Sequence, residues 1–216
     1  MSDRPIIFSA PMIHALLDGR KTQTRRVLRP QPSARPELHE PMSDEDAYWA
    51  VFDGDEIAHR VQVPYAPGDR LWVREGHAMV PATAYRMSEG VAQNADPKDC
   101  DRACIYREGW DRSNGGFRWR SPIHMPRWAS RLTLTVTDVR VQRLQEISED
   151  DARTEGFGSL ITTVDKLGPS ITARDGFRDI WNSIHGPDAW DANPWVAAIS
   201  FTVHRCNIDT MEEGTW

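Results

Sequence analysis

The stretch Gly19–Arg26, GRKTQTRR, lies at a change of pattern that decides how the start of the chain folds. Just before it, apolar residues recur at helical spacing in APMIHALLDG (10–19), and the glycine is a helix stop. From Lys21 to Leu28, polar and β-branched residues alternate, which favours a strand over further helix. Residues 5–9, PIIFS, are typical of a short strand. The sequence therefore predicts a strand, a short helix and a second strand at the start of the chain.

The composition predicts one soluble domain spanning residues 1–216. Hydrophobic residues make up 39% of the chain, enough for a buried core, and no apolar run approaches the roughly 18 residues of a membrane span. The start lacks the pattern of a signal peptide, and three cysteines are an odd number that suits reduced thiols better than disulfides. We therefore expect a cytoplasmic protein without a membrane partner, and the oligomeric state stays open.

The charge of the chain restricts its partners. A net charge of −6 argues against a protein whose main role is to bind duplex DNA, because affinity for DNA comes largely from neutralising its phosphates. A local basic pocket for a nucleotide or a single strand stays compatible with this charge. The nine tryptophans are unusual, and flat aromatic faces stack on nucleobases, although packing is the commoner role of a tryptophan.

Three further strands are predicted from alternation. Residues 71–75, LWVRE, follow a Pro-Gly-Asp turn and alternate as a half-buried strand. Residues 132–141 carry the longest alternation in the chain, and residues 193–205, NPWVAAISFTVHR, form a closing strand.

Two helices are predicted in the C-terminal half. Residues 148–156 form a short helix with Ser148 as N-cap, Asp151 at the capping-box position and Gly156 as the stop. Residues 171–186, ITARDGFRDIWNSIHG, carry apolar residues at helical spacing and form an amphipathic helix.

Two segments, residues 30–64 and 76–122, lose periodicity and are rich in Pro, Gly and charged residues. We expect both to be irregular insertions, the first with a small hairpin at VFDGDEIAHRV (51–61). The mixture of strands and short helices predicts an α+β fold built as a small barrel. A doubly wound parallel sheet is not expected, because the chain has neither a long βαβ repeat nor a Gly-rich dinucleotide loop.

With GRKTQTRR, PGDRLWVRE, DARTEG and NPWV in this order, the chain resembles the ASCH domain family, a relative of the PUA domains, and especially its longer phage- and prophage-borne members. The most specific motif is Gly-x-Lys-Thr-x-Thr-x-Arg, here Gly19, Lys21, Thr22, Thr24 and Arg26. The resemblance covers the N-terminal segment and most of the C-terminal half. It implies a small PUA-like β-barrel with flanking short helices and a cleft for a nucleobase or nucleotide, with both insertions outside the minimal domain.

The resemblance also implies an activity. Small bacterial ASCH enzymes are amidohydrolases that remove the acyl group from N4-acetylcytidine and related N4-acylcytidines, using a Lys, a Thr and a Glu. By motif, Lys21 and Thr24 match the first two. Glu155 in DARTEG is the best positional match for the Glu, and Glu75 at the end of LWVRE is the runner-up. The implied protein is a hydrolase of a nucleoside or nucleobase that uses no cofactor.

Elementary chemistry restricts how these groups could work. A threonine hydroxyl needs a base close by, and Lys21 can be that base only if burial or positive neighbours lower its pKa from about 10.4 toward 7. A carboxylate beside the lysine, such as Glu155, raises that pKa, so the pair would titrate jointly. In an alternative assignment, Thr24 donates to the oxyanion and Glu155 activates a water. Because positions 21 and 24 of a continuous strand face opposite sides, Lys21 is expected in the turn before the strand.

Arg26 and aromatic residues of LWVRE and MPRW are the expected contacts of the base, which makes the predicted substrate-binding residues Arg26, Trp72, Glu75 and Trp128. A second hypothesis is a PUA-like module that binds RNA or another single strand, with ribonuclease activity as a hybrid of the two. Its basic groove would be formed by Arg20, Arg25, Arg26, Arg29, Arg127 and Arg131. The acidic total charge favours a small substrate over a nucleic-acid polymer.

A metal site is not expected. Cys100 and Cys104, in CDRAC, could form half of a zinc site with His124 or His77, but the chain lacks a second pair of cysteines.

Overall fold

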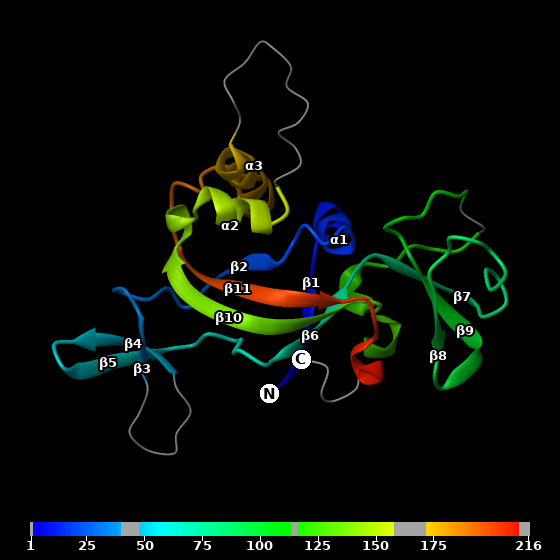
Figure 1. The fold of residues 1–216 in the computed structure, drawn as a ribbon, viewed down its shortest axis with the longest axis horizontal. Helices are drawn as coiled ribbons and strands as arrows, with labels where there is room; N and C mark the ends of the chain where they lie inside the picture. Colours follow the sequence, from blue (N-terminus) through cyan, green and yellow to red (C-terminus); the bar gives the residue numbers. More distant parts are fainter. Residues whose placement is uncertain (1, 40–47, 114–115, 158–171, 212–216) are drawn as a thin grey trace, which may run out of the picture. The chain divides into compact units, whose positions relative to one another are not determined.

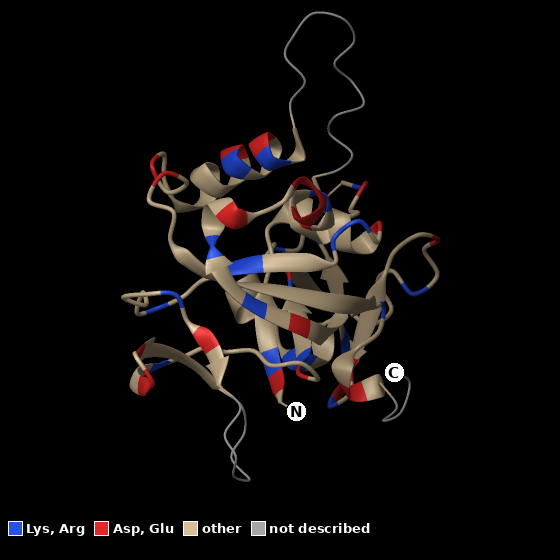
Figure 2. Cartoon of the chain, turned by 60° about the vertical axis from the view of Figure 1, so that its left-hand side comes forward, with Lys and Arg blue, Asp and Glu red and all other residues tan. Residues whose placement is uncertain are grey.

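The computed structural model describes residues 2–39, 48–113, 116–157 and 172–211 (Figure 1). Acidic and basic side chains both occur along its elements (Figure 2), as expected for 32 Asp and Glu against 26 Lys and Arg. None of the helices in these ranges combines the length and the apolar character that crossing a bilayer requires.

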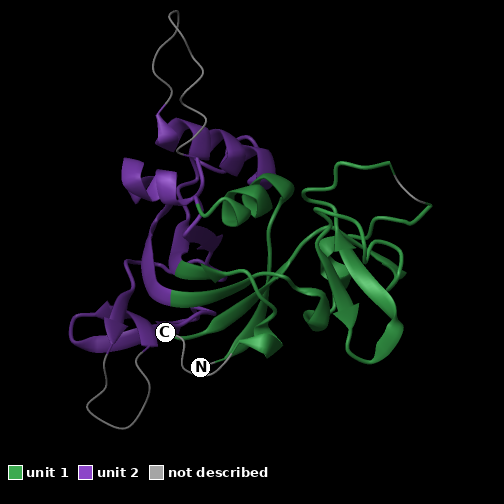
Figure 3. Ribbon diagram, turned by 45° about the vertical axis from the view of Figure 1, so that its right-hand side comes forward, with its two compact units in different colours: residues 1–19, 68–136, 201–216 green, residues 20–67, 137–200 purple. Residues whose placement is uncertain are grey.

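The chain forms two compact units (Figure 3). Unit 1 contains residues 1–19, 68–136 and 201–216, and unit 2 contains residues 20–67 and 137–200. The predicted single domain is neither confirmed nor contradicted by this division, because the chain passes repeatedly from one unit to the other.

The main sheet has five strands in the order β1 (Asp3–Ile7), β6 (Arg70–Arg74), β10 (Thr133–Arg143), β11 (Trp195–His204) and β2 (Gln23–Val27). Within unit 1, β1 is parallel to β6, and the start of β10 is antiparallel to β6. Within unit 2, β11 is antiparallel to β2. All five strands were predicted, and the mixed α+β class is confirmed. Among the described strands this sheet is open, because β1 and β2 are edge strands. It therefore does not confirm the expected barrel.

The first insertion contains a three-stranded antiparallel sheet in unit 2, formed by β3 (Glu37–His39), β4 (Tyr48–Asp53) and β5 (Glu56–Val61). The predicted hairpin is therefore confirmed, and the prediction of an otherwise irregular segment 30–64 is wrong. The strand that was not predicted is β3, whose three residues are too few to show an alternation of apolar and polar side chains.

The second insertion also contains a three-stranded antiparallel sheet, in unit 1: β7 (His77–Pro81), β9 (Asp99–Tyr106) and β8 (Gln93–Asp96). The prediction of an irregular segment 76–122 is wrong. The first half of β9 is exposed and its second half is fully buried, so burial does not alternate along it. The buried face is covered largely by aromatic residues from loops, which are Tyr85, Trp110, Phe117 and Trp119. The cover lies outside the strands, and the local pattern does not reveal it.

Two helices in unit 2, α2 (Glu149–Thr154) and α3 (Ala173–His185), lie on one side of the strands β2 and β11 (Figure 1). The helix α2 begins at its predicted cap, where the Ser148 hydroxyl oxygen accepts a hydrogen bond from the Asp151 backbone N–H at 3.0 Å, and α3 begins at Thr172, a cap that was not predicted. The helices pack over an apolar cluster whose buried members include Leu144, Ile147, Ala152, Phe157, Ala173, Phe177, Trp181 and Val196. Short 3-10 turns occur at Pro122–His124, Arg127–Ala129, Leu144–Glu146 and Ile208–Thr210.

The helix α1 (Ala10–Leu17) ends in the turn that leads into β2. The Gly19 N–H donates to the carbonyl oxygen of Leu16 at 3.1 Å, and Gly19 has a φ of 72°. This left-handed conformation costs a residue with a Cβ about 1–2 kcal/mol. The predicted glycine stop is confirmed, and it determines where the chain leaves the helix before Lys21.

Gly19→Ala is expected to lower the free energy of unfolding by about 1 kcal/mol, measured by urea denaturation. A methyl group there meets no atom within 4 Å, so the loss comes from backbone conformation alone. Gly176→Ala is the matched control, because Gly176 lies inside α3 and its methyl also meets no atom within 4 Å. In this control variant the free energy of unfolding is expected to rise by up to about 1 kcal/mol. Equal shifts in both variants would contradict the left-handed turn.

Candidate functional site

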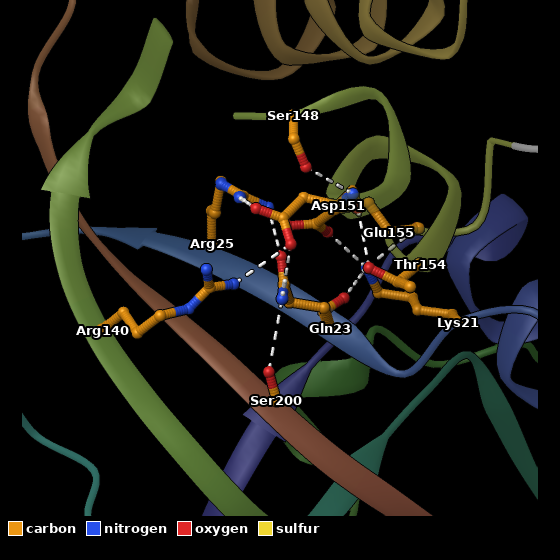
Figure 4. A network of polar contacts seen from close by, with 9 residues as sticks. All are labelled: Lys21, Gln23, Arg25, Arg140, Ser148, Asp151, Thr154, Glu155 and Ser200. Atoms are coloured by element: carbon orange, nitrogen blue, oxygen red, sulfur yellow. Dashed lines mark hydrogen bonds and ion pairs between the residues drawn. The ribbon is translucent and has the colours of Figure 1, made fainter. Parts of the chain in front are cut away.

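Lys21 lies just before β2 and is completely buried, with 0% of its surface exposed. Its Nζ donates to Glu155 Oε2 at 2.7 Å, to the Glu155 backbone oxygen at 3.1 Å and to the Gln23 backbone oxygen at 2.7 Å (Figure 4). Three acceptors satisfy the three N–H groups of an ammonium. Lys21 and Glu155 therefore form a buried, hydrogen-bonded ion pair. Lys21 lies after the turn at Asp18–Gly19 and before the first residue of β2.

The end of α2 places Glu155 against Lys21. Glu155 is the C-cap of this helix, and Gly156 follows with a φ of 105°. The Thr22 N–H donates to the Thr154 carbonyl oxygen at 2.8 Å, and Lys21 and Glu155 form an isolated β-bridge. A carboxylate at a helix C-terminus is disfavoured by the helix dipole, so Glu155 needs positive partners. The structure supplies two of them.

Arg25 is the second partner of Glu155, and its side chain is fully buried. Its Nη1 donates to Glu155 Oε1 at 3.1 Å and to Gln23 Oε1 at 2.7 Å, and its Nη2 donates to Asp151 Oδ2 at 3.0 Å. Glu155 thus has Lys21 on one carboxylate oxygen and Arg25 on the other. This arrangement fixes the plane of the carboxylate and leaves neither buried cation without a counter-charge.

Asp151 and Gln23 complete the network. Gln23 Nε2 donates to Asp151 Oδ1 at 3.3 Å and to Ser200 Oγ at 3.2 Å, and Arg140 donates to Asp151 Oδ1 at 3.1 Å. Burial raises the pKa of Asp151, but the hydrogen bond from Arg140 and the charge of Arg25 outweigh it and hold that pKa below its ordinary value of 3.8. Asp151 therefore stays ionised and supports the charge of Arg25.

Opposing effects act on Lys21. Burial lowers the pKa of Lys21, the Glu155 carboxylate raises it, and the positive charges of Arg26 and Arg25 lower it again. The net result is a pKa below the ordinary 10.5, because desolvation is the largest of these effects. A lysine whose pKa is lowered can both donate and accept a proton. Here it is in direct contact with a carboxylate, which can do the same.

Thr24 is buried within β2 and pairs with Ile199 of β11. Because side chains alternate along a strand, Thr24 leaves β2 on the face opposite to Gln23 and Arg25. Within the described part of the chain, its hydroxyl forms no side-chain hydrogen bond with another residue. Arg26 shares the face of Thr24 and is hydrogen-bonded to Tyr65. The structure thus joins Lys21 to Glu155 directly and shows no hydrogen bond from either to Thr24.

The other predicted site residues lie in unit 1. Trp72 is buried in β6 with the Arg74 guanidinium 4.8 Å from its ring centroid, and Trp128 packs against the cluster around Tyr106 and Met125. Glu75 is 1% exposed and accepts two hydrogen bonds from Arg131, each 2.8 Å long. Burial raises the pKa of Glu75, although Arg131 opposes this shift.

Sequence reasoning missed the roles of Arg25, Asp151 and Gln23. Arg25 was expected as a positive neighbour of Lys21 and as part of a basic RNA groove, and Asp151 was expected as a capping residue. One signal was available: Asp151 and Glu155 are four residues apart, so a helix places both carboxylates on one face. Nothing local indicated that Arg25 would join them, because it is 126 positions from Asp151 in the sequence.

Several arginines of the hypothetical RNA groove already have partners. Arg25 is held by Asp151 and Glu155 in unit 2. In unit 1, Arg127 forms ion pairs with Asp3 and Asp209, and Arg131 with Glu75. Paired arginines attract phosphate less strongly, so this set does not favour a basic groove.

The cysteines show no sign of metal chemistry. Cys100 is exposed, whereas Cys104 is buried, and burial raises the pKa of the Cys104 thiol to about 12. Metal binding requires the thiolate, which such a pKa disfavours. In the ranges that the structure describes, no group of three or more His, Cys, Asp or Glu residues could hold a metal ion.

Comparison with known proteins yields little. No family model matches the chain, and no curated protein matches it. Among solved structures, it is similar to the crystal structure of protein EF3133 from Enterococcus faecalis V583, described by the family model DUF984, with 12% sequence identity and a TM-score of 0.40. The match covers 98% of this chain and 86% of the other.

Glu155→Gln is expected to destabilise the protein by about 3–5 kcal/mol, because it leaves the buried Lys21 ammonium without a counter-charge, and Lys21→Met is expected to cost less, because Glu155 keeps Arg25. The double variant should cost clearly less than the sum of the two single variants, since both charges are then absent. Urea unfolding at neutral pH measures all three values. Strictly additive losses would contradict a direct Lys21–Glu155 interaction.

Asp151 should add a pH dependence to stability. Its pKa is lowered by folding, so its contribution is fully present above the unfolded value of about 3.8 and is lost as the pH falls through the folded pKa. We expect the stability difference between wild type and Asp151→Asn to stay constant near neutrality and to shrink below pH 3.8. Urea unfolding across this range measures it, with the exposed Asp150→Asn as the control for charge loss. Parallel profiles for wild type and Asp151→Asn would contradict this role.

Proposed function

We propose that the chain is an amidohydrolase that removes the acyl group from N4-acylated cytidine or cytosine derivatives, as its resemblance to the ASCH family implies. The observation that supports this most is the buried Lys21–Glu155 pair, in which Nζ lies 2.7 Å from Oε2. These residues were selected from the motifs alone, and they come from segments 134 positions apart in the sequence. We also propose that the protein is cytoplasmic and that its substrate is a small molecule. The PUA-like barrel that the resemblance implies is part of this proposal.

The pair has the chemistry that amide hydrolysis needs. The reaction requires a nucleophile, a group that takes its proton, and a donor for the oxyanion and the leaving nitrogen. In the proposed mechanism, Glu155 accepts the proton of the nucleophile, and the Lys21 ammonium donates to the leaving exocyclic nitrogen. Lys21 is suited to this because its pKa is lowered by burial, and Arg25 keeps the Glu155 carboxylate in one orientation.

The nucleophile is either the Thr24 hydroxyl or a water. Thr24 is next to the Gln23 carbonyl that Lys21 binds, but its side chain leaves the strand on the other face from Gln23 and Arg25. A nucleophilic Thr24 therefore requires a change of its contacts when substrate binds. A water activated by Glu155 requires no such change, and Thr24 then serves the site as an oxyanion donor or as packing.

Turnover requires access to the pair. Lys21 and Glu155 are 0% and 2% exposed, so side chains that cover them must move before a substrate reaches either group. Arg26, on the face of Thr24, is the proposed contact for the carbonyl of the base. The residues named in this mechanism belong to unit 2, whereas Trp72, Glu75 and Trp128, the other predicted substrate-binding residues, belong to unit 1 and stay predictions.

The test is release of cytidine from N4-acetylcytidine by the purified full chain, followed by chromatography. We expect release by the wild type and a loss of at least about 100-fold in Glu155→Gln, the scale of general acid–base catalysis. Circular dichroism must show that the variant is folded, and Asp150→Asn, on the exposed side of α2, is the matched control and should retain activity. No release by the folded wild type, or full activity in a folded Glu155→Gln variant, would overturn the function.

Thr24→Val identifies the nucleophile. Valine has nearly the same shape as threonine, and the Thr24 hydroxyl has no hydrogen bond to another described side chain, so the variant should fold with little loss of stability. A loss of activity of about 100-fold or more assigns the nucleophile to Thr24. Activity within about tenfold of the wild type assigns it to water.

A further inference from the structure

A pocket in unit 1, separate from the residues of the proposed hydrolase, has an unusual lining. It is open to solvent, has a volume of about 530 Å³ and is lined by Met79, Phe117, Arg118, Arg120 and His124. Pockets of roughly 300–1,000 Å³ hold small organic ligands in other proteins. Two guanidinium groups and an imidazole therefore face a space large enough for a nucleotide.

The segment that forms most of this pocket is basic, although the chain as a whole is acidic. Residues 116–131 contain four arginines and one histidine and no Asp or Glu, against a net charge of −6 for the whole chain. Charges of both signs are spread over the other described elements (Figure 2). A segment whose charged residues are all positive and that lines a pocket indicates an anionic ligand.

The cations of the pocket differ from the other arginines of the same segment. Arg127 and Arg131 each form an ion pair with a carboxylate. Arg118, Arg120 and His124, by contrast, form no ion pair and no side-chain hydrogen bond with any residue that the structure describes. The two guanidinium charges and the His124 ring are therefore available to a ligand.

The backbone holds the pocket in place. Arg120 and His77 form a β-bridge, with N–H to O distances of 3.3 Å from His77 to Arg120 and 2.7 Å from Arg120 to His77. Phe117 and Trp119 pack edge-on against each other, with ring centroids 5.0 Å apart, and both pack against the buried face of the β7-β9-β8 sheet. Arg118 and Arg120, on either side of Trp119, both line the pocket.

His77, the bridge partner of Arg120, also has a buried polar atom without a partner among the described residues. His77 is fully buried, its Nδ1 lies 3.2 Å from the Glu75 carbonyl oxygen, and its Nε2 has no hydrogen-bond partner among the described residues. The nearby charges of Arg120, His124 and Arg74 all act on this ring. A buried polar atom without a partner is costly, and a ligand or a water that reaches it removes that cost.

We propose that this pocket binds the phosphate of a nucleotide through Arg118, Arg120 and His124, with the nucleoside against Phe117 and Met79. Guanidinium groups bind phosphate oxygens in a bidentate geometry, and an aromatic ring and a thioether suit a flat, weakly polar base. The nucleotide is either free or part of a single RNA strand, since both present the same phosphate and base. This site does not depend on the hydrolase function, because it uses other residues in the other unit.

Isothermal titration calorimetry in a phosphate-free buffer tests the site on the full chain, with cytidine 5′-monophosphate, cytidine, inorganic phosphate and a ten-nucleotide single-stranded RNA as probes. The monophosphate should bind clearly more tightly than either cytidine or inorganic phosphate. Equal affinity for the monophosphate and the RNA assigns the site to a free nucleotide. Tighter binding of the RNA with a steep salt dependence assigns it to a strand.

The decisive comparison uses two variants that remove the same charge. Arg118→Ala/Arg120→Ala should weaken binding of the monophosphate by at least about tenfold, since each charge-assisted hydrogen bond contributes about 1.5–3 kcal/mol. Arg86→Ala/Arg112→Ala, which removes two other exposed arginines of unit 1, should leave the affinity within about twofold. No binding by the wild type, or the same loss in both variants, would overturn the site.

Discussion

The ion pair between Lys21 and Glu155 is the interaction on which unit 2 depends. Moving two charges out of water is costly, and their attraction offsets this cost only when further hydrogen bonds satisfy both groups. Here Lys21 has three acceptors, and Glu155 has Arg25 on its second oxygen. The pair joins the start of β2 to the end of α2, and the turn at Gly19 sets where β2 begins.

Two buried glutamates in this chain show why the identity of the cation matters. Glu75 is held by both guanidinium N–H groups of Arg131, and an arginine does not give up its proton in a protein. Glu155 is held partly by Lys21, whose pKa is lowered by burial. Only the second pair contains a cation whose pKa is lowered below its ordinary value and that can release its proton. This difference favours Glu155 over Glu75 as the glutamate of a catalytic pair.

Local pattern was sufficient for the strands of the main sheet, the cap at Ser148 and the stop at Gly19, since each depends on neighbouring residues. Lys21 and Glu155 were selected together by a family resemblance, not by any local signal. The hydrogen bond from Arg25 to Asp151 could not be predicted from the sequence, because no periodicity connects a strand to a helix 126 positions away. The sheet of the second insertion was missed because loop aromatics bury β9. In the first insertion the hairpin was predicted, but β3, with three residues, was too short to show a pattern.

The protonation of Lys21 can be measured directly, by following the 15N and 13C resonances of its side chain through a pH titration. Burial should place its pKa below the ordinary 10.5 in the wild type. In Glu155→Gln the pKa should fall further, because the carboxylate that favours the ammonium is removed. A wild-type pKa at or above 10.5, or no response to Glu155→Gln, would contradict a buried proton-exchanging pair.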